Sequence, residues 1–161
     1  MKTLIVYYSM GGNTEWAAKA VAAGTGADLL RIEPEKQYPD RGFKKFFWGG
    51  KSAVMAETPA LKPYRFDAAA YDRVVFGFPV WAGNVTPPIR SFIRENQAAL
   101  QGRRFAAFAC QSGAGAEKAF KKLSECLGGA NLEAELALID PRDKPARQNE
   151  EKIAAFCGRI K

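Results

Sequence analysis

Short apolar runs alternate with longer stretches of helical periodicity, and this alternation constrains the fold more than any other feature. The first run, TLIVYY, is rich in β-branched and aromatic residues, as is typical of a strand buried on both faces. Such strands need helices on both sides of the sheet, which predicts an α/β protein with a mostly parallel sheet. The predicted strands cover residues 3–8, 28–34, 73–80, 103–110 and 132–140. The predicted helices cover residues 14–23, 86–100, 115–129 and 149–160.

One connection is much longer than the others. The chain has 161 residues, which predicts a single domain over 1–161 with an insertion at about 35–72. The aromatic and basic stretch 41–57, RGFKKFFWGGKSAVMAE, predicts a helix or helical turn followed by an irregular return. Three interpretations stay open for it: an amphipathic helix packed on the domain, a flap over a ligand, and a docking patch for a membrane surface or partner.

Composition narrows the class of protein. Apolar residues make up 47% of the chain and charged residues 25%, as in a soluble globular protein. No apolar run approaches the roughly 18 residues of a membrane span, so no transmembrane segment is expected. The opening residues MKTLIVYYS turn polar too soon for a signal peptide, and we therefore expect a cytoplasmic protein.

The chain has no histidine and three widely spaced cysteines, Cys110, Cys126 and Cys157. Without histidine, Ser-His-Asp and Cys-His mechanisms are excluded, so any redox or transfer chemistry should come from a cofactor. The odd number and wide spacing of the cysteines argue against a disulfide framework and a zinc site. We expect no bound metal, and we expect the cysteines to be small buried side chains.

The net charge is +7, from 24 basic and 17 acidic residues. Two interpretations stay open: a solvated basic surface, or attraction to phosphate-bearing or acidic partners. No nucleic-acid partner is expected.

The first predicted strand ends in a loop that suits a phosphate group. Glycines here allow positive φ and close backbone approach, and the helix that follows offers unpaired N–H groups. The short side chains of Ser9, Asn13 and Thr14 are expected to add hydrogen-bond donors. Because the loop has no Lys or Arg, a single phosphate monoester fits better than a triphosphate. The candidate residues are Ser9, Met10, Gly11, Gly12, Asn13 and Thr14.

Two further loops follow strands three and four and should reach the same edge of the sheet. Alone, Trp81 is typical of core or lid packing; beside these loops, stacking on a planar ring is favoured. Together the loops predict a site for a mononucleotide with a flat heterocycle. The candidate residues are Pro79, Val80, Trp81, Ala82 and Gly83 in one loop, and Ser112, Gly113, Ala114 and Gly115 in the other.

Other families of similar architecture lack support in these residues. GxxxxGK[ST] and GxGxxG are both absent, which disfavours nucleotide triphosphatases and dinucleotide-binding Rossmann proteins. Response-regulator receivers need an acidic pair after strand one, where this chain has Tyr8 and Ser9. Low-molecular-weight phosphatases need a cysteine and an arginine in the first loop, and neither is present.

The three loops, in this order, resemble the flavodoxin-like family. SMGGNT is similar to the family pattern [ST]-x-T-G-N-T, with Gly11 replacing the middle hydroxyl residue, and PVWAG matches P-[IV]-W-x-G. A subgroup of small flavodoxin-like proteins has a second tryptophan where this chain has Ala82. The resemblance implies a doubly wound five-stranded parallel sheet of order 2-1-3-4-5, and FMN held by the three loops.

The resemblance implies electron transfer or oxidoreduction at the flavin, with two main alternatives. One is an FMN-dependent oxidoreductase that uses NAD(P)H and passes electrons to a quinone or a redox partner protein. The other is a carrier for a partner enzyme, although carrier flavodoxins are typically acidic and this chain is basic. An oxidase of porphyrin precursors is a weaker third alternative.

Overall fold

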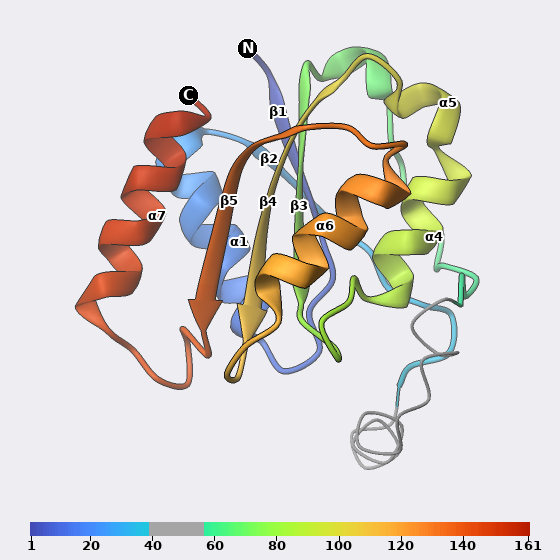
Figure 1. The fold of residues 1–161 in the computed structure, drawn as a ribbon. Helices are drawn as coiled ribbons and strands as arrows, with labels where there is room; N and C mark the ends of the chain where they lie inside the picture. The colour runs from blue at the N-terminus through green and yellow to red at the C-terminus, as the bar shows by residue number, and fades with distance from the viewer. Residues whose placement is uncertain (39–56) are drawn as a thin grey trace.

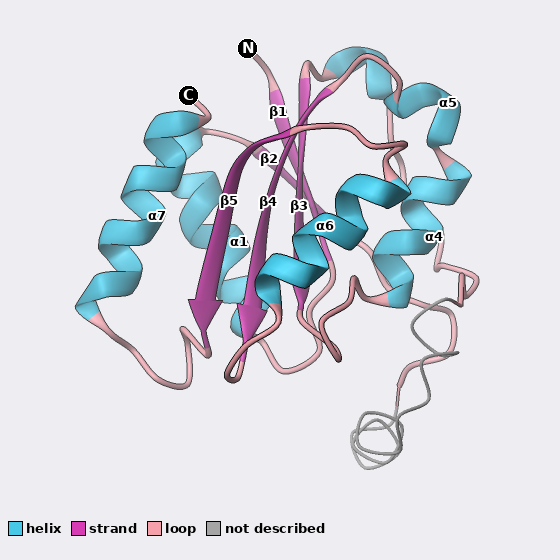
Figure 2. Ribbon diagram, viewed as in Figure 1, coloured by secondary structure: helices cyan, strands magenta, loops and turns pink. Residues whose placement is uncertain are grey.

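The computed structural model describes residues 1–38 and 57–161, whose arrangement is shown in Figures 1 and 2. Five strands form one sheet in the order β2-β1-β3-β4-β5, and each strand runs parallel to its neighbours. The α/β class and the order 2-1-3-4-5 are thereby confirmed. The strands are β1 (Thr3–Tyr7), β2 (Asp28–Arg31), β3 (Arg73–Pro79), β4 (Arg104–Gln111) and β5 (Leu132–Ile139).

Helices cover both faces of the sheet (Figure 1). The helices α1 (Asn13–Thr25) and α7 (Arg147–Arg159) pack on the face that presents Ile5, Val75 and Phe108. On the opposite face, α4 (Pro87–Glu95) and α6 (Ala116–Cys126) pack against residues such as Val6 and Phe76. Two short helices, η1 (Ala68–Ala70) and α5 (Gln97–Leu100), lie in the connections. No helix in the described ranges is long and apolar enough to cross a bilayer.

Two of the differences between predicted and observed elements involve identifiable contacts. The helix predicted over 86–100 is interrupted at Asn96, whose side-chain amide and backbone N–H both donate to the Phe92 carbonyl, at 2.8 and 3.1 Å. The strand predicted over 28–34 ends at Arg31, and Pro34 instead forms an isolated antiparallel bridge with Leu61.

Thr86 is the N-cap residue of α4, but its hydroxyl does not cap the helix. A capping side chain accepts from the second or third helical N–H. The second helical residue is Pro88, which has no N–H, and the N–H of Ile89, the third, donates to the Thr86 carbonyl at 3.1 Å. The Thr86 hydroxyl is left buried with no partner in the described structure.

The long connection between β2 and β3 is described only in part, and the helix predicted around 42–57 lies outside the described residues, apart from Glu57. Residues 57–67 form the irregular return that the sequence predicts. They cross α4: Ser91 Oγ donates to the Pro59 carbonyl at 2.6 Å, and the rings of Tyr64 and Phe66 pack on Phe92.

A buried ion pair ties three strands together near their amino ends. The Arg73 side chain on β3 is almost fully buried, and its Nε donates to Glu133 Oε2 on β5 at 2.7 Å. Glu133 Oε1 also accepts from Arg104 on the intervening strand β4, and Arg73 Nη1 donates to the carbonyl of Ile160. Burial alone would raise the pKa of Glu133, but the hydrogen bonds from Arg73 and Arg104 outweigh it and hold that pKa below its usual range.

We expect Glu133→Gln to lower the free energy of unfolding at pH 7 by about 3 kcal/mol, because it leaves the buried Arg73 without its counter-ion. A lowered pKa means that the ionised carboxylate stabilises the fold above the ordinary glutamate value of about 4.3 and that this stabilisation is lost as the pH falls below it. Urea unfolding at pH 7 and below pH 4 should therefore show the gap between wild type and variant closing in acid.

The matched control is Glu135→Gln, which removes an exposed charge from the same strand. It should leave the unfolding free energy within about 0.5 kcal/mol of wild type. An equal loss in both variants would contradict a special role for the Glu133 ion pair.

Candidate functional site

The loops predicted to form a site all leave the carboxyl edge of the sheet, where the strand arrows end in Figure 1. The connections after β1 and β3 lead to helices on opposite faces, α1 and α4. In open α/β sheets, ligands bind at the carboxyl edge where two neighbouring parallel strands diverge in this way.

The first loop turns sharply at Gly12, the residue before α1. Gly12 has φ of +95°, a left-handed conformation that disfavours any residue with a β-carbon. Ser9 Oγ accepts from the N–H of Glu15 at 3.1 Å, and the Gly12 carbonyl accepts from the N–H of Trp16 at 3.0 Å. Arg31 Nη2 at the end of β2 donates to the Ser9 carbonyl at 3.2 Å, so the loop is fixed from both sides.

Four consecutive N–H groups in this loop have no acceptor among the described residues. Within residues 1–38 and 57–161, the backbone N–H groups of Gly11, Gly12, Asn13 and Thr14 make no hydrogen bond. They lie where the positive end of the helix dipole adds to their attraction for an anion. A β-carbon on Gly11 would meet nothing within 4 Å, so this side of the loop is open.

The side chains of Asn13 and Thr14 lie elsewhere than their predicted role requires. Thr14 is buried beneath the loop, where its hydroxyl contacts the Cys110 thiol. Asn13 Oδ1 accepts from the N–H groups of Arg142 and Asp143 at 2.9 and 3.3 Å, and its Nδ2 donates to Asp143 Oδ2 at 2.9 Å. The expectation that both side chains donate to an anion stays a prediction, while the backbone supplies the exposed donors.

The second loop is a tight turn over residues 81–84. Trp81 and Asn84 exchange backbone hydrogen bonds of 3.4 and 2.9 Å, and both central residues, Ala82 and Gly83, have positive φ. This is the pattern of a type I′ turn. Arg90 Nη2 holds the turn by donating to Asn84 Oδ1 at 2.6 Å.

Trp81 is 3% exposed in the structure. Its ring meets Tyr8 and Tyr38 edge to face, at centroid distances of 5.8 and 5.4 Å. Burial raises the pKa of Tyr38 to about 12. Trp81 thus lies where the core or lid packing interpretation places it. Its stacking on a planar ligand stays a prediction.

The third loop lies directly against the second. Gly115 has φ of +108°, and a β-carbon there would come within 3.1 Å of Gly83 Cα and 3.2 Å of Val80 Cγ1. The Gln111 side chain accepts from the N–H of Ala116 at 2.9 Å and so caps α6. The structure therefore brings the second and third candidate loops together, with Ser112, Gly113 and Ala114 exposed.

A fourth loop, residues 140–146 after β5, joins this edge and was not predicted. Ser112 Oγ donates to Asp140 Oδ1 at 3.4 Å, which connects the fourth loop to the third. The Asn13 contacts to Arg142 and Asp143 connect it to the first. The sequence PRDKPAR directly follows a predicted strand. Loops that follow parallel strands reach the carboxyl edge of the sheet, so the same reasoning could have identified this loop from the sequence.

The three cysteines are free, with Cys110 and Cys157 buried and Cys126 partly buried. Burial raises the pKa of the Cys110 thiol to about 12, against the opposing effect of the Thr14 hydroxyl. A neutral thiol at this pKa is a poor nucleophile, so Cys110 acts as packing beneath the first loop.

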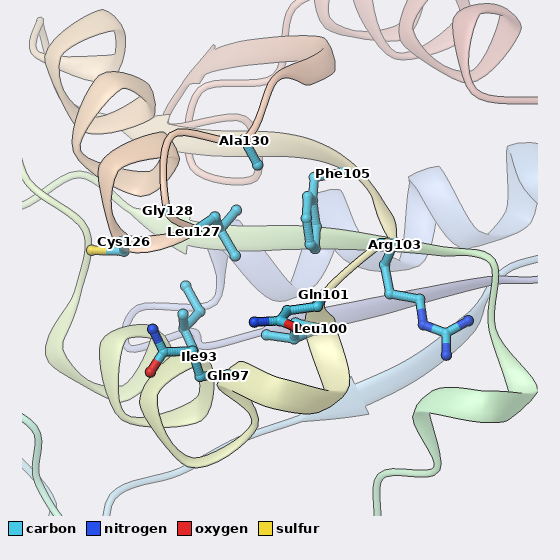
Figure 3. A pocket seen from close by; sticks show the side chains of 11 residues that line it. Ile93, Gln97, Leu100, Gln101, Arg103, Phe105, Cys126, Leu127, Gly128 and Ala130 are labelled. Carbon is cyan, nitrogen blue, oxygen red and sulfur yellow. The ribbon is translucent and has the colours of Figure 1, made fainter.

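A cavity of about 340 Å³ lies at the opposite end of the molecule, near the amino ends of the strands (Figure 3). None of the candidate loop residues lines it, so it is separate from the candidate site. Its lining residues are Ile93, Gln97, Leu100, Gln101, Gly102, Arg103, Phe105, Cys126, Leu127, Gly128 and Ala130.

Comparison with protein families gives one match that spans most of the chain. Residues 2–147 match the family described as Flavodoxin. The chain belongs to the flavodoxin family.

Solved structures of similar fold come from several bacteria. A chain from Bacteroides eggerthii, assigned as a flavoprotein, is 26% identical with a TM-score of 0.78, over 98% of this flavodoxin and 96% of that chain. A flavoprotein from Lactobacillus acidophilus in complex with FMN is 21% identical (TM-score 0.68, 88% and 95% covered). Two-electron reduced flavodoxin from Megasphaera elsdenii is 16% identical (TM-score 0.58, 97% and 98% covered). The last two likenesses show the shared fold.

We expect Gly12→Ala in this flavodoxin to lower the free energy of unfolding by about 1–2 kcal/mol, the cost of a left-handed residue with a β-carbon. The new methyl group would also collide with the guanidinium of Arg142, whose Cζ would lie 2.8 Å away. Urea unfolding of the ligand-free protein measures the loss.

Gly11→Ala is the matched control, because Gly11 lacks positive φ and its β-carbon would enter open space. It should change the unfolding free energy by less than about 0.5 kcal/mol. If both alanine variants lost the same stability, the special conformation of Gly12 would not be the cause.

Proposed function

We propose that this flavodoxin binds FMN at the carboxyl edge of its sheet and transfers electrons through it to a quinone-like acceptor or a partner protein. The observation that carries the proposal is the row of four unpartnered N–H groups from Gly11 to Thr14, at the start of α1. Four donors converging on one helix start suit the three oxygens of a terminal phosphate.

The residues at the edge fit the rest of the cofactor as well. The exposed third loop, Ser112 to Gly115, would contact the ribityl chain and the pyrimidine side of the ring. The turn Val80 to Gly83 would lie beside the flavin, its backbone groups within reach of the ring nitrogens. Family membership and the likeness to flavoproteins support this placement.

FMN supplies the redox chemistry, since it can exchange hydride or single electrons. The protein would bind and orient the flavin ring, and its fold would determine which protein groups face the ring nitrogens. The turn at Ala82 and Gly83 is held by its own hydrogen bonds and by Arg90, so it presents a fixed set of backbone groups. Met10 and Pro79, both partly exposed, complete the candidate loops at this edge.

The net charge of +7 guides the choice of acceptor. A basic surface favours small anionic donors such as NAD(P)H and acidic partner proteins. We therefore favour an FMN-dependent oxidoreductase of the NAD(P)H:quinone type over a carrier for one partner enzyme. The porphyrin-precursor oxidase stays a third candidate.

Binding is tested by titrating ligand-free protein with FMN and with riboflavin, which lacks the phosphate, while following flavin fluorescence. We expect FMN to bind at least about 100-fold more tightly, equivalent to two charge-assisted hydrogen bonds at about 1.4 kcal/mol each. Equal affinity for the two ligands, or no uptake of either, would refute the proposed phosphate site.

The two functional classes are separated by turnover. FMN-loaded protein is mixed with NADH or NADPH and a soluble quinone, and quinone reduction is followed by absorbance. We expect steady turnover from at least one nicotinamide. If the flavin is reduced only when a second redox protein is added, the carrier alternative replaces the oxidoreductase.

A further inference from the structure

The candidate phosphate loop, residues 9–14, contains no Lys or Arg. The phosphate monoester of FMN nevertheless carries between one and two negative charges near neutral pH. Neutral N–H groups can bind such an anion, but a guanidinium strengthens the site and adds geometric selectivity. The structure brings one to the loop from a distant part of the sequence.

That guanidinium belongs to Arg142 in the fourth loop. Its position is defined by Gly12: a β-carbon built there would collide with Arg142 Nη1 and lie 2.8 Å from Cζ. The N–H of Gly12 has no acceptor among the described residues, and the β-carbon side of Gly12 faces the Arg142 guanidinium. The guanidinium therefore lies against one residue of the row of free N–H groups.

The hydrogen bonds of Arg142 leave one end of the guanidinium available. Nε donates to Asp143 Oδ1 at 2.9 Å, and Nη2 lies 2.8 Å from the same oxygen. Nη1, the nitrogen closest to Gly12, has no acceptor in the described part of the chain. Asp143 therefore orients the side chain and leaves its free donor facing the loop.

The fourth loop is held in place independently of the Arg142 side chain. Asn13 Oδ1 accepts from the backbone N–H groups of Arg142 and Asp143, and the Asp140 carbonyl accepts from the N–H of Lys144 at 2.7 Å. Asn13 thus acts as a clamp between the first and fourth loops. A substitution at Arg142 that keeps the backbone leaves these bonds intact.

Two other cations close to the first and fourth loops are already engaged. Arg31 pairs with both Glu15 and Glu33 at 3.0 Å and donates to the Ser9 carbonyl. Lys144 pairs with Asp140 at 3.3 Å. Within the described ranges, Arg142 is the cation that combines proximity to Gly12 with a free donor.

We propose that Arg142 is a phosphate-recognition residue of this flavodoxin, contacting the FMN phosphate through Nη1 and supplying the positive charge that the first loop lacks. The inference rests on the proposed FMN site and identifies a residue from a fourth loop as part of it. Arg142 would position the phosphate and select phosphorylated flavin over riboflavin, with no part in electron transfer.

The test compares FMN and riboflavin dissociation constants for wild type, Arg142→Gln and Arg142→Lys. Arg142→Gln should weaken FMN binding about tenfold or more, as for loss of one charge-assisted hydrogen bond, and change riboflavin binding less than about twofold. Arg142→Lys, which keeps the charge but loses the planar fork, should recover part of the FMN affinity.

Arg147→Gln is the matched control, because it removes the same charge from the exposed first residue of α7. It should leave both dissociation constants unchanged. FMN affinity should also fall with added salt in wild type, and fall less steeply in Arg142→Gln, because one charge–charge attraction has been removed.

The outcomes separate the two proposals. If wild type binds FMN no better than riboflavin, the FMN phosphate site itself fails. If wild type discriminates strongly but Arg142→Gln keeps the same ratio, or weakens FMN only as much as Arg147→Gln does, the role of Arg142 is overturned. Equal weakening of FMN and riboflavin in Arg142→Gln would likewise overturn it, since that pattern indicates a structural role.

Discussion

Burial of β1 and β3 on both faces is the constraint on which the rest of this structure depends. Val6 and Val75, on adjacent strands, are completely buried and face opposite helical layers. Parallel strands that are covered on both sides connect through helices, and each connection lies on one face of the sheet or the other. After β1 the chain turns to α1, and after β3 it turns to α4. The candidate site lies at the edge where those two connections diverge.

The first loop is suited to bind an anion because the backbone N–H groups at the start of α1 lack acceptors. Every α-helix begins with N–H groups that lack intrahelical acceptors. In α1, Ser9 accepts from the N–H of Glu15, while the N–H groups from Gly11 to Thr14 have no acceptor among the described residues. The left-handed conformation of Gly12 lets the loop enter α1 at the next residue. Gly11 leaves one side of the loop open, and the β-carbon side of Gly12 faces Arg142.

The α/β class was predictable from the sequence because the buried strands are apolar and alternate with helical periodicity. The strand order came from the resemblance to the flavodoxin-like family, and the structure confirms it. Hydrophobic periodicity could not predict details that depend on local hydrogen bonds. The side chain of Asn96 bonds to the Phe92 carbonyl where α4 ends. The Thr86 hydroxyl does not cap α4, because Pro88 lacks an N–H and the N–H of Ile89 bonds to the Thr86 carbonyl.

The same distinction applies to the site. The three glycine loops could be placed at one edge because the strands are parallel, but the direction of each side chain could not be predicted. Asn13 bonds to the backbone N–H groups of Arg142 and Asp143, and its expected role toward an anion stays a prediction. Trp81 packs between Tyr8 and Tyr38.

These contacts change how the charge of the site is understood. A loop without cations appears neutral in sequence, yet the fourth loop brings Arg142 to Gly12 from 130 residues away along the chain (142 − 12). The Asn13 side chain holds the fourth loop against the first by accepting from the backbone N–H of Arg142. Asp143 contacts two of the three guanidinium nitrogens of Arg142, which leaves Nη1 for a further partner. The affinity of this edge for an anion therefore depends on the contact between the first loop, after β1, and the fourth loop, after β5. The first loop alone does not determine it.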